Sequence, residues 1–241
     1  MDGYFNLGGY RRPITTRSLE AQLWFDRGLN WSYAFQREEA LRCFEKVIEL
    51  DPDCAMGYWG LAYATGPYYN SPWDQFPRRM LPGVIEKANH HAREALKRDA
   101  HTSPVEQAII QALIVRFPTP TCEDKALLSQ WDDDYAQAMR EVYAQFPTDN
   151  DVCALAAEAL ICRTPWQLWD LDRRCPADGA DTTEAIAIIQ DAVERMADAG
   201  EEPHPGLLHF YIHIMEMSPE PEKTLPASDT GLKRIKMTST R

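Results

Sequence analysis

The segment from Ala21 to Cys54 constrains the fold of this 241-residue chain more than any other part of the sequence. It reads AQLWFDRGLNWSYAFQREEALRCFEKVIELDPDC, with apolar residues at helical spacing. Gly28 and Ala40 allow two antiparallel helices to approach closely, and Pro52 ends the second helix. The bulky residues that fill the space between the helices are Trp24, Trp31 and Phe44.

The spacing of these residues resembles the 34-residue tetratricopeptide repeat. Looser copies cover residues 55–102, 103–149 and 150–199, and an incomplete one opens at His204. Proline and glycine separate the helical stretches, and no stretch alternates as a strand would. We therefore expect an all-α, right-handed α-solenoid of about five tetratricopeptide-like hairpins, the last one incomplete. Its expected parts are an N-terminal extension (1–20), the solenoid (21–230) and a basic, disordered tail (231–241).

A wider resemblance is carried by two stretches, SLEAQLWFDRGLNWSYAFQREEALRCFEKVIELDPDCAMGYWGLAYATGPYYNSPW and HPGLLHFYIHIMEMSPEPEKTLPASD. They resemble the N-terminal part of a family of large, poorly characterised tetratricopeptide-repeat proteins of bacteria and fungi. Members of that family continue with further repeats, so the resemblance implies that this chain is either a truncated or a differently spliced version. Some fungal relatives lie among genes of specialised metabolism, but the resemblance implies no particular reaction.

The charge balance disfavours two classes of partner. Lys and Arg number 25 and Asp and Glu number 37, which gives a net charge of −12. Such an acidic surface repels nucleic acids and anionic membranes. The first residues lack the basic lead and apolar stretch of a secretory signal, and no apolar run reaches membrane-spanning length, so we expect a cytoplasmic protein. Its six scattered cysteines are expected to be reduced.

The first helix of each repeat in such arrays usually lines a concave groove. The repeat phase predicts a groove that runs from aromatic to acidic, and the insert GPYYNSPW adds further aromatic side chains. The insert either closes over the groove as a lid that stacks on a flat ligand, or plugs a gap between repeats. The predicted groove residues are Phe25, Trp59, Tyr63, Tyr68, Tyr69, Trp73, Gln107 and Gln111.

The last repeat carries two histidines on one helix face, His209 and His213. Glu216 lies one turn further on, and the phase places Glu158 at the matching position of the neighbouring helix. Two imidazoles and a carboxylate suit zinc, iron or copper. The same residues also suit a polar ligand without metal, or a purely structural role. His204, just before a helix-starting proline, is expected to cap the helix or pack in the loop, and not to bind a metal.

Several familiar sites are absent from the sequence. There is no glycine-rich phosphate loop, no dinucleotide fingerprint and no Gly-x-Ser-x-Gly elbow. The run Trp131-Asp132-Asp133-Asp134 is interpreted as carboxylates at the start of a helix that face water.

Three hypotheses follow from the sequence. The first is a scaffold that binds a protein segment or a small molecule in the groove, with self-association through the incomplete last repeat. The second is a metal-dependent enzyme that uses His209, His213 and a carboxylate from Glu158 or Glu216. The third is a truncated relative without activity of its own. Whether the protein is an enzyme stays open at this point.

Overall fold

The computed structural model describes residues 4–225, and every structural statement below concerns these residues. Helices dominate, and the strands are one two-residue pair, Trp169–Asp170 (β1) and Cys175–Pro176 (β2). No helix in this range combines the length and the apolar character that crossing a bilayer demands. The α-helices are α1 (Leu19–Tyr33), α2 (Arg37–Leu50), α3 (Ala55–Thr65), α4 (Leu81–Leu96), α5 (Pro104–Arg116), α6 (Lys125–Gln145), α7 (Asn150–Ile161), α8 (Thr182–Asp198) and α9 (Pro205–Met215).

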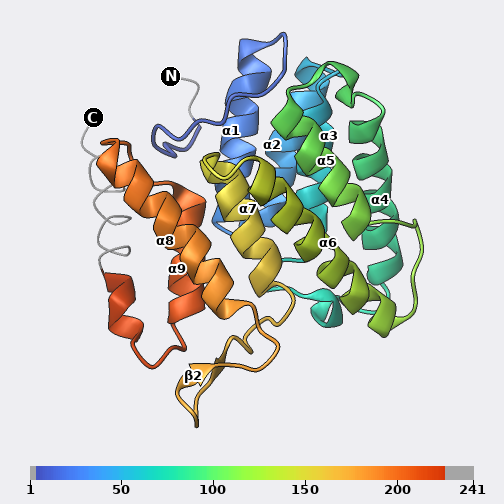
Figure 1. Ribbon diagram of the computed structural model, residues 1–241. Helices are drawn as coiled ribbons and strands as arrows, with labels where there is room; N and C mark the ends of the chain where they lie inside the picture. The colour runs from blue at the N-terminus through green and yellow to red at the C-terminus, as the bar shows by residue number, and fades with distance from the viewer. Residues whose placement is uncertain (1–3, 226–241) are drawn as a thin grey trace.

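Consecutive helices pack as hairpins, α1 with α2, α3 with α4, α5 with α6 and α7 with α8 (Figure 1). Two glycines let these helices approach closely. A Cβ atom added at Gly28 of α1 would lie 2.7 Å from the ring of Phe44, and one added at Gly60 of α3 would lie 2.4 Å from the same ring. The all-α solenoid of helical hairpins expected from the sequence is confirmed.

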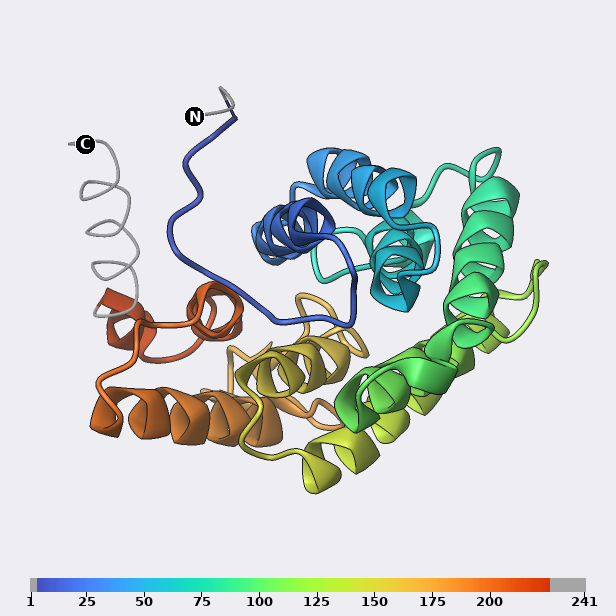
Figure 2. The same cartoon turned by 90° about the horizontal axis from the view of Figure 1, so that it is seen from above.

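The hairpins follow a curved path whose two ends meet (Figure 2). Helix α9 contacts both α7 and α1, so the last hairpin returns to the first. Gly206 of α9 makes this contact close, because a Cβ atom there would lie 2.8 Å from the ring of Tyr33. The inner surface of the arc is therefore enclosed, and it is not an open channel along the array.

Helix α6 begins earlier than the sequence suggested. It starts at Lys125, after Asp124, whose side chain accepts a hydrogen bond from the backbone N–H of Ala126. Asp132 therefore lies in the second turn and is only 7% exposed. The interpretation of Asp132 as a water-facing carboxylate at a helix start is wrong, because the extra turns rotate this residue towards α5.

The predicted basic tail, residues 231–241, lies outside the described residues. The fifth hairpin is described as α9 followed by a 3₁₀ turn, Pro221–Thr224 (η3). Self-association through this repeat stays a prediction.

Candidate binding site on the inner surface

Residues 4–18, here called the N-terminal strap, form no helix or strand but are held along the solenoid (Figure 2). At its start, the strap covers the outer edge of the first hairpin. The ring of Tyr4 lies 5.0 Å from that of Trp24, and its hydroxyl accepts a 2.8 Å hydrogen bond from Nε1 of Trp31. The guanidinium of Arg27 lies 4.2 Å from the centre of the Tyr4 ring. The strap then passes between α1 and the helices α7 and α9.

Two side chains of helix α1 form hydrogen bonds with the backbone of the strap. Asp26 accepts a 3.0 Å hydrogen bond from the backbone N–H of Arg12. Gln22 donates to the carbonyl of Arg12 at 2.7 Å and accepts from the backbone N–H of Ile14 at 2.9 Å. Gln22 also donates to Asp26 at 2.8 Å, which fixes both side chains. These hydrogen bonds are made to backbone groups, so they depend on the direction and the extended conformation of the bound segment more than on the identity of its side chains.

The strap is held in the same way further along. Glu106, at the start of α5, accepts hydrogen bonds of 2.7 Å from both the backbone N–H and the hydroxyl of Thr15. Glu106 is itself fixed by a capping box with Ser103, the N-cap residue of α5. The hydroxyl of Thr16 donates to Asp51, at the end of α2. The first hairpin (α1 and α2) and the third (α5) therefore both hold the strap. The fourth hairpin adds a further contact through α7, described next.

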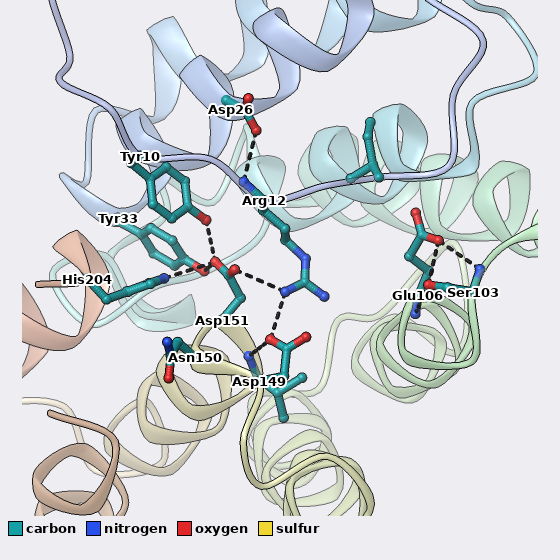
Figure 3. Close-up of polar contacts among 12 residues, drawn as sticks. Tyr10, Arg12, Asp26, Tyr33, Ser103, Glu106, Asp149, Asn150, Asp151 and His204 are labelled. Carbon is teal, nitrogen blue, oxygen red and sulfur yellow. Dashed lines mark hydrogen bonds and ion pairs between the residues drawn. The ribbon is translucent and has the colours of Figure 1, made fainter. Parts of the chain in front are cut away.

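Asp151, in the first turn of α7, is the centre of the site (Figure 3). Its Oδ1 atom accepts hydrogen bonds from the hydroxyls of Tyr10 and Tyr33, the latter at 2.7 Å. Its Oδ2 atom lies 3.0 Å from Nη1 of Arg12, and the same nitrogen donates to Asp149 at 2.8 Å. One carboxylate thus joins the strap to α1 and α7.

His204 connects this centre to the last hairpin. It is the N-cap residue of α9, where its Nδ1 accepts a hydrogen bond from the backbone N–H of Leu207. The expectation that His204 acts as a helix cap is confirmed. Because Nδ1 is an acceptor, the ring proton is on Nε2, which donates to Asp151 at 3.0 Å.

Electrostatics keep this cluster charged in the interior. Burial alone would raise the pKa of Asp151, but Arg12 and the donors around the carboxylate hold that pKa well below its usual range. Burial and the charge of Asp151 raise the pKa values of Tyr10 and Tyr33, which therefore remain hydroxyl donors. At Asp26, burial outweighs the accepted hydrogen bonds and raises the pKa to about 6.

A pocket of about 540 Å³ opens beside this cluster, between the strap and the segment that leads into α9. Its acidic lining residues outnumber its basic ones, because four carboxylates face two arginines, Arg11 and Arg12. The pocket therefore favours cationic groups. The lining carboxylates are Asp149, Asp151, Glu201 and Glu202.

The aromatic side chains predicted to line an open groove lie in the core instead. Phe25, Trp59, Tyr63 and Tyr69 are at most 1% exposed, and Trp73 is 7% exposed. The reason is visible in their contacts, because Phe25 packs 5.6 Å from the ring of Phe44 and Trp59 stacks on Tyr63 at 5.1 Å. These positions fill the core within and between hairpins, since Phe25 also packs 6.4 Å from the ring of Trp59 in the next hairpin.

The remaining predicted groove residues occupy separate places. Tyr68 of the insert lies between the ring of Phe35, at 4.9 Å, and the guanidinium of Arg37, at 4.6 Å. Gln107 donates hydrogen bonds to backbone carbonyls before α5, whereas Gln111 is exposed. Both glutamines line a shallow hollow between α5 and α6, away from the strap.

The predicted metal ligands are only partly brought together. Nε2 of His209 lies 3.0 Å from Nε2 of His213, and Nδ1 of His213 lies 3.0 Å from Glu216. His209 also contacts the backbone carbonyl of Tyr33, so the histidines help to join α9 to α1. Within the described part of the chain, no three His, Cys, Asp or Glu side chains are arranged to hold one metal ion.

Glu158, a predicted metal ligand, instead forms an ion pair and a hydrogen bond in the core. It is fully buried, pairs with Arg37 at 2.9 Å and accepts a hydrogen bond from the hydroxyl of Tyr63. The expected set of two histidines with Glu158 or Glu216 is corrected accordingly, because both Glu158 oxygens already have partners and the histidines are engaged with Tyr33 and Glu216.

Sequence reasoning missed the residues that hold the strap. A signal existed for one of them, since the Ser103–Glu106 spacing indicates a capping box. Nothing local marks Gln22, Asp26 or Asp151 as binding residues, because their partners lie far away in sequence or in the unpatterned first residues.

Helical hairpins stacked in an arc define the class of protein, an α-solenoid. Residues 21–54 match the family model of the tetratricopeptide repeat, so this part of the chain carries one such repeat. Repeats of this kind generally mediate protein–protein interaction or scaffolding. No curated protein and no solved structure matches the chain.

Proposed function

We propose that the protein is a binding or scaffold protein that holds an extended protein segment on its inner surface. The observation that supports this proposal is the strap itself. Gln22, Asp26 and Glu106 bind its backbone N–H and C=O groups, which is how domains recognise extended peptides. The strap occupies the site as a built-in ligand, and a partner segment of similar chemistry would compete with it.

The side chains of the strap indicate which partner segments fit. Tyr10 and Arg12 are the two strap residues that reach Asp151, and one residue separates them. The acidic pocket beside them adds Glu201 and Glu202. The site therefore suits a basic segment with a Tyr-x-Arg pattern, since such a segment replaces both the hydroxyl and the charge that the strap supplies.

A labelled peptide with the sequence of residues 4–18 tests the proposal by fluorescence anisotropy. In the wild-type chain, the tethered strap competes at an effective concentration in the millimolar range, so added peptide binds weakly. The variant Arg12→Ala loosens the strap, and we expect it to bind the peptide roughly tenfold or more tightly than the wild-type chain does. Arg17→Ala is the matched control, because the side chain of Arg17 is exposed and lies outside the pocket.

Two further measurements make the result decisive. Tyr10→Phe loosens the strap more gently and keeps the proposal testable if Arg12→Ala does not fold, as judged by circular dichroism. Adding Asp151→Asn to the loosened chain must weaken peptide binding, because the arginine of the peptide then loses its buried partner. A loosened, folded chain that binds no peptide, or whose peptide binding is insensitive to Asp151→Asn, contradicts the proposal.

A further inference from the structure

A second pocket, of about 470 Å³, lies away from the strap. It is enclosed by the insert before α4, the first turns of α6 and the loop that follows α7. Three aromatic side chains line it: Trp73, Phe76 and Trp166. A cavity of this size with aromatic walls and a few polar groups is typical of small-molecule sites.

Trp166 is held at the pocket in an unusual backbone conformation. Its φ angle is +59°, which is rare for a bulky residue and costs backbone free energy. Its side chain is 39% exposed, so packing of the indole in the core does not explain the conformation. The ring has one aromatic neighbour, Tyr69, with ring centres 6.2 Å apart and nearly perpendicular planes. A large apolar face is thereby presented to the pocket.

The floor of the pocket holds a carboxylate that is incompletely hydrogen-bonded. Asp132 lines the pocket and is only 7% exposed, and its Oδ1 atom has no hydrogen-bond partner among the described residues. The same atom lies 3.4 Å from Nε of Arg116, which is fully buried. None of the three guanidinium nitrogens of Arg116 has a hydrogen-bond partner in residues 4–225. Buried polar groups in this condition are rare in folded proteins.

The mouth of the pocket carries free positive charge. Arg78 and Lys125 are exposed, and neither forms an ion pair with any described residue. Arg163 also lines the pocket but already pairs with Asp133 and Asp181. Asp74 opposes the two free cations, which leaves a surplus of one positive charge at the mouth. This surplus matches a carboxylate better than a doubly charged phosphate.

We propose that this pocket binds a flat aromatic acid that carries a hydrogen-bond donor on its ring, with the ring against Trp73 and Trp166, the donor on Asp132 and the carboxylate near Arg78 and Lys125. Each part of the ligand supplies what the pocket lacks. The ring covers the exposed indole, the donor gives Asp132 a hydrogen bond that its 3.4 Å contact with Arg116 does not supply, and the carboxylate offsets the positive charge at the mouth. The site is independent of the inner surface and of the strap.

The test uses 4-hydroxycinnamate as the probe and isothermal titration calorimetry of the full chain as the measurement. We expect saturable binding of one molecule per chain. Cinnamate, which lacks the hydroxyl donor, should bind about tenfold more weakly. The methyl ester of 4-hydroxycinnamate, which lacks the charge, should bind more weakly and lose the salt dependence of the acid. These comparisons change the ligand only, so they do not depend on the folding of a variant.

Variants locate the site. Trp166→Ala should weaken binding of 4-hydroxycinnamate about three- to tenfold through the lost aromatic contact. Leu171→Ala is the matched control, because Leu171 is exposed in the same loop and lies outside the pocket. No binding at millimolar probe, equal affinity for cinnamate, or an affinity unchanged by Trp166→Ala overturns the proposal.

Discussion

Two buried arginines in this protein sit beside carboxylates, and their surroundings differ sharply. Nη1 of Arg12 reaches Asp149 at 2.8 Å and Asp151 at 3.0 Å, and among its buried nitrogens in residues 4–225 Nε alone lacks a partner. Arg116 lies 3.4 Å from Asp132, and none of its three nitrogens is hydrogen-bonded within the described residues. In both places the nearby carboxylates outweigh burial and raise the pKa of the arginine.

The comparison shows that burial of a charge does not reveal its role. The donors around Asp151 come from three parts of the fold, so the cluster joins the strap, the first hairpin and the last one. Around Asp132, the ion pair with Arg116 is long and poorly hydrogen-bonded, and a pocket lies alongside. A buried network whose hydrogen bonds are all formed stabilises one arrangement of the chain. A network with unsatisfied groups beside a pocket can instead form its missing hydrogen bonds with a ligand.

The largest expected effect is that of Asp151→Ala. The variant leaves Arg12 buried beside Asp149 alone, and it removes the acceptor of Tyr10, Tyr33 and His204. We expect the free energy of unfolding to fall by about 3–5 kcal/mol, measured by urea denaturation. The matched Asp132→Ala should cost clearly less, because Asp132 completes fewer hydrogen bonds. Equal losses in the two variants would remove the distinction between the two sites.

Arg12→Met should have the next largest effect. Asp151 keeps three donors in this variant, so we expect a loss of about 2–3 kcal/mol in the free energy of unfolding. The strap should also become sensitive to trypsin at Arg17 under conditions in which the helices stay intact. A strap as resistant as that of the wild-type chain would show that Arg12 does not hold it.

Arg116→Met should lower the free energy of unfolding by about 1–2 kcal/mol, because it leaves Asp132 without its ion-pair partner but removes a guanidinium that lacks hydrogen bonds. Arg37→Met serves as the comparison in the same urea assay. Arg37 donates to the carbonyl of Tyr63 at 3.0 Å and to Glu158 at 2.9 Å, so its loss should cost more. The reverse order would contradict our interpretation of the Arg116 site.

The smallest effect concerns pH. Burial raises the pKa values of Asp26 and Asp132 from 3.8 to about 6, although Arg116 opposes the shift at Asp132. A raised pKa in the folded state means that these groups favour folding below about pH 4, and that this contribution is lost as the pH rises to about 6. Asp151, with its lowered pKa, acts in the opposite sense, because its contribution is present above about pH 4 and is lost below it.

The double variant Asp26→Asn with Asp132→Asn should therefore lose part of the change in stability between pH 4 and pH 6. Urea midpoints at several pH values measure this. Asp134→Asn, which alters an exposed carboxylate bonded to Gln130, is the control and should leave the profile unchanged. A double variant with the pH profile of the wild-type chain would contradict the assigned pKa directions.

The sequence predicts the parts of the fold that depend on local spacing. Gly28 and Phe44 mark the first hairpin, and Pro104 and Pro205 mark helix starts that the structure confirms. The closure of the arc depends on small rotations that accumulate over the whole array, and no local pattern records them. The contact of Tyr33 with Gly206 therefore had no sequence signal.

The candidate site was harder to predict for the same reason. The repeat phase selected Phe25 on α1, but the strap lies against Gln22 and Asp26 of that helix, and Phe25 packs between hairpins. A binding face that is covered by another segment of the chain differs from the open face that the phase predicts. The first 18 residues show no periodic pattern, so their partners became visible only in three dimensions.

The central claim is that the solenoid binds the backbone of residues 4–18 as it would bind a peptide. Hydrogen exchange followed by NMR tests this claim most directly, at the backbone N–H groups of Arg12, Ile14 and Thr15. Each of these groups donates to a side chain of the solenoid, so exchange should be as slow as in the helices of the first hairpin. Exchange as fast as that of the exposed loop at residues 119–123 would show that the inner surface does not hold the strap.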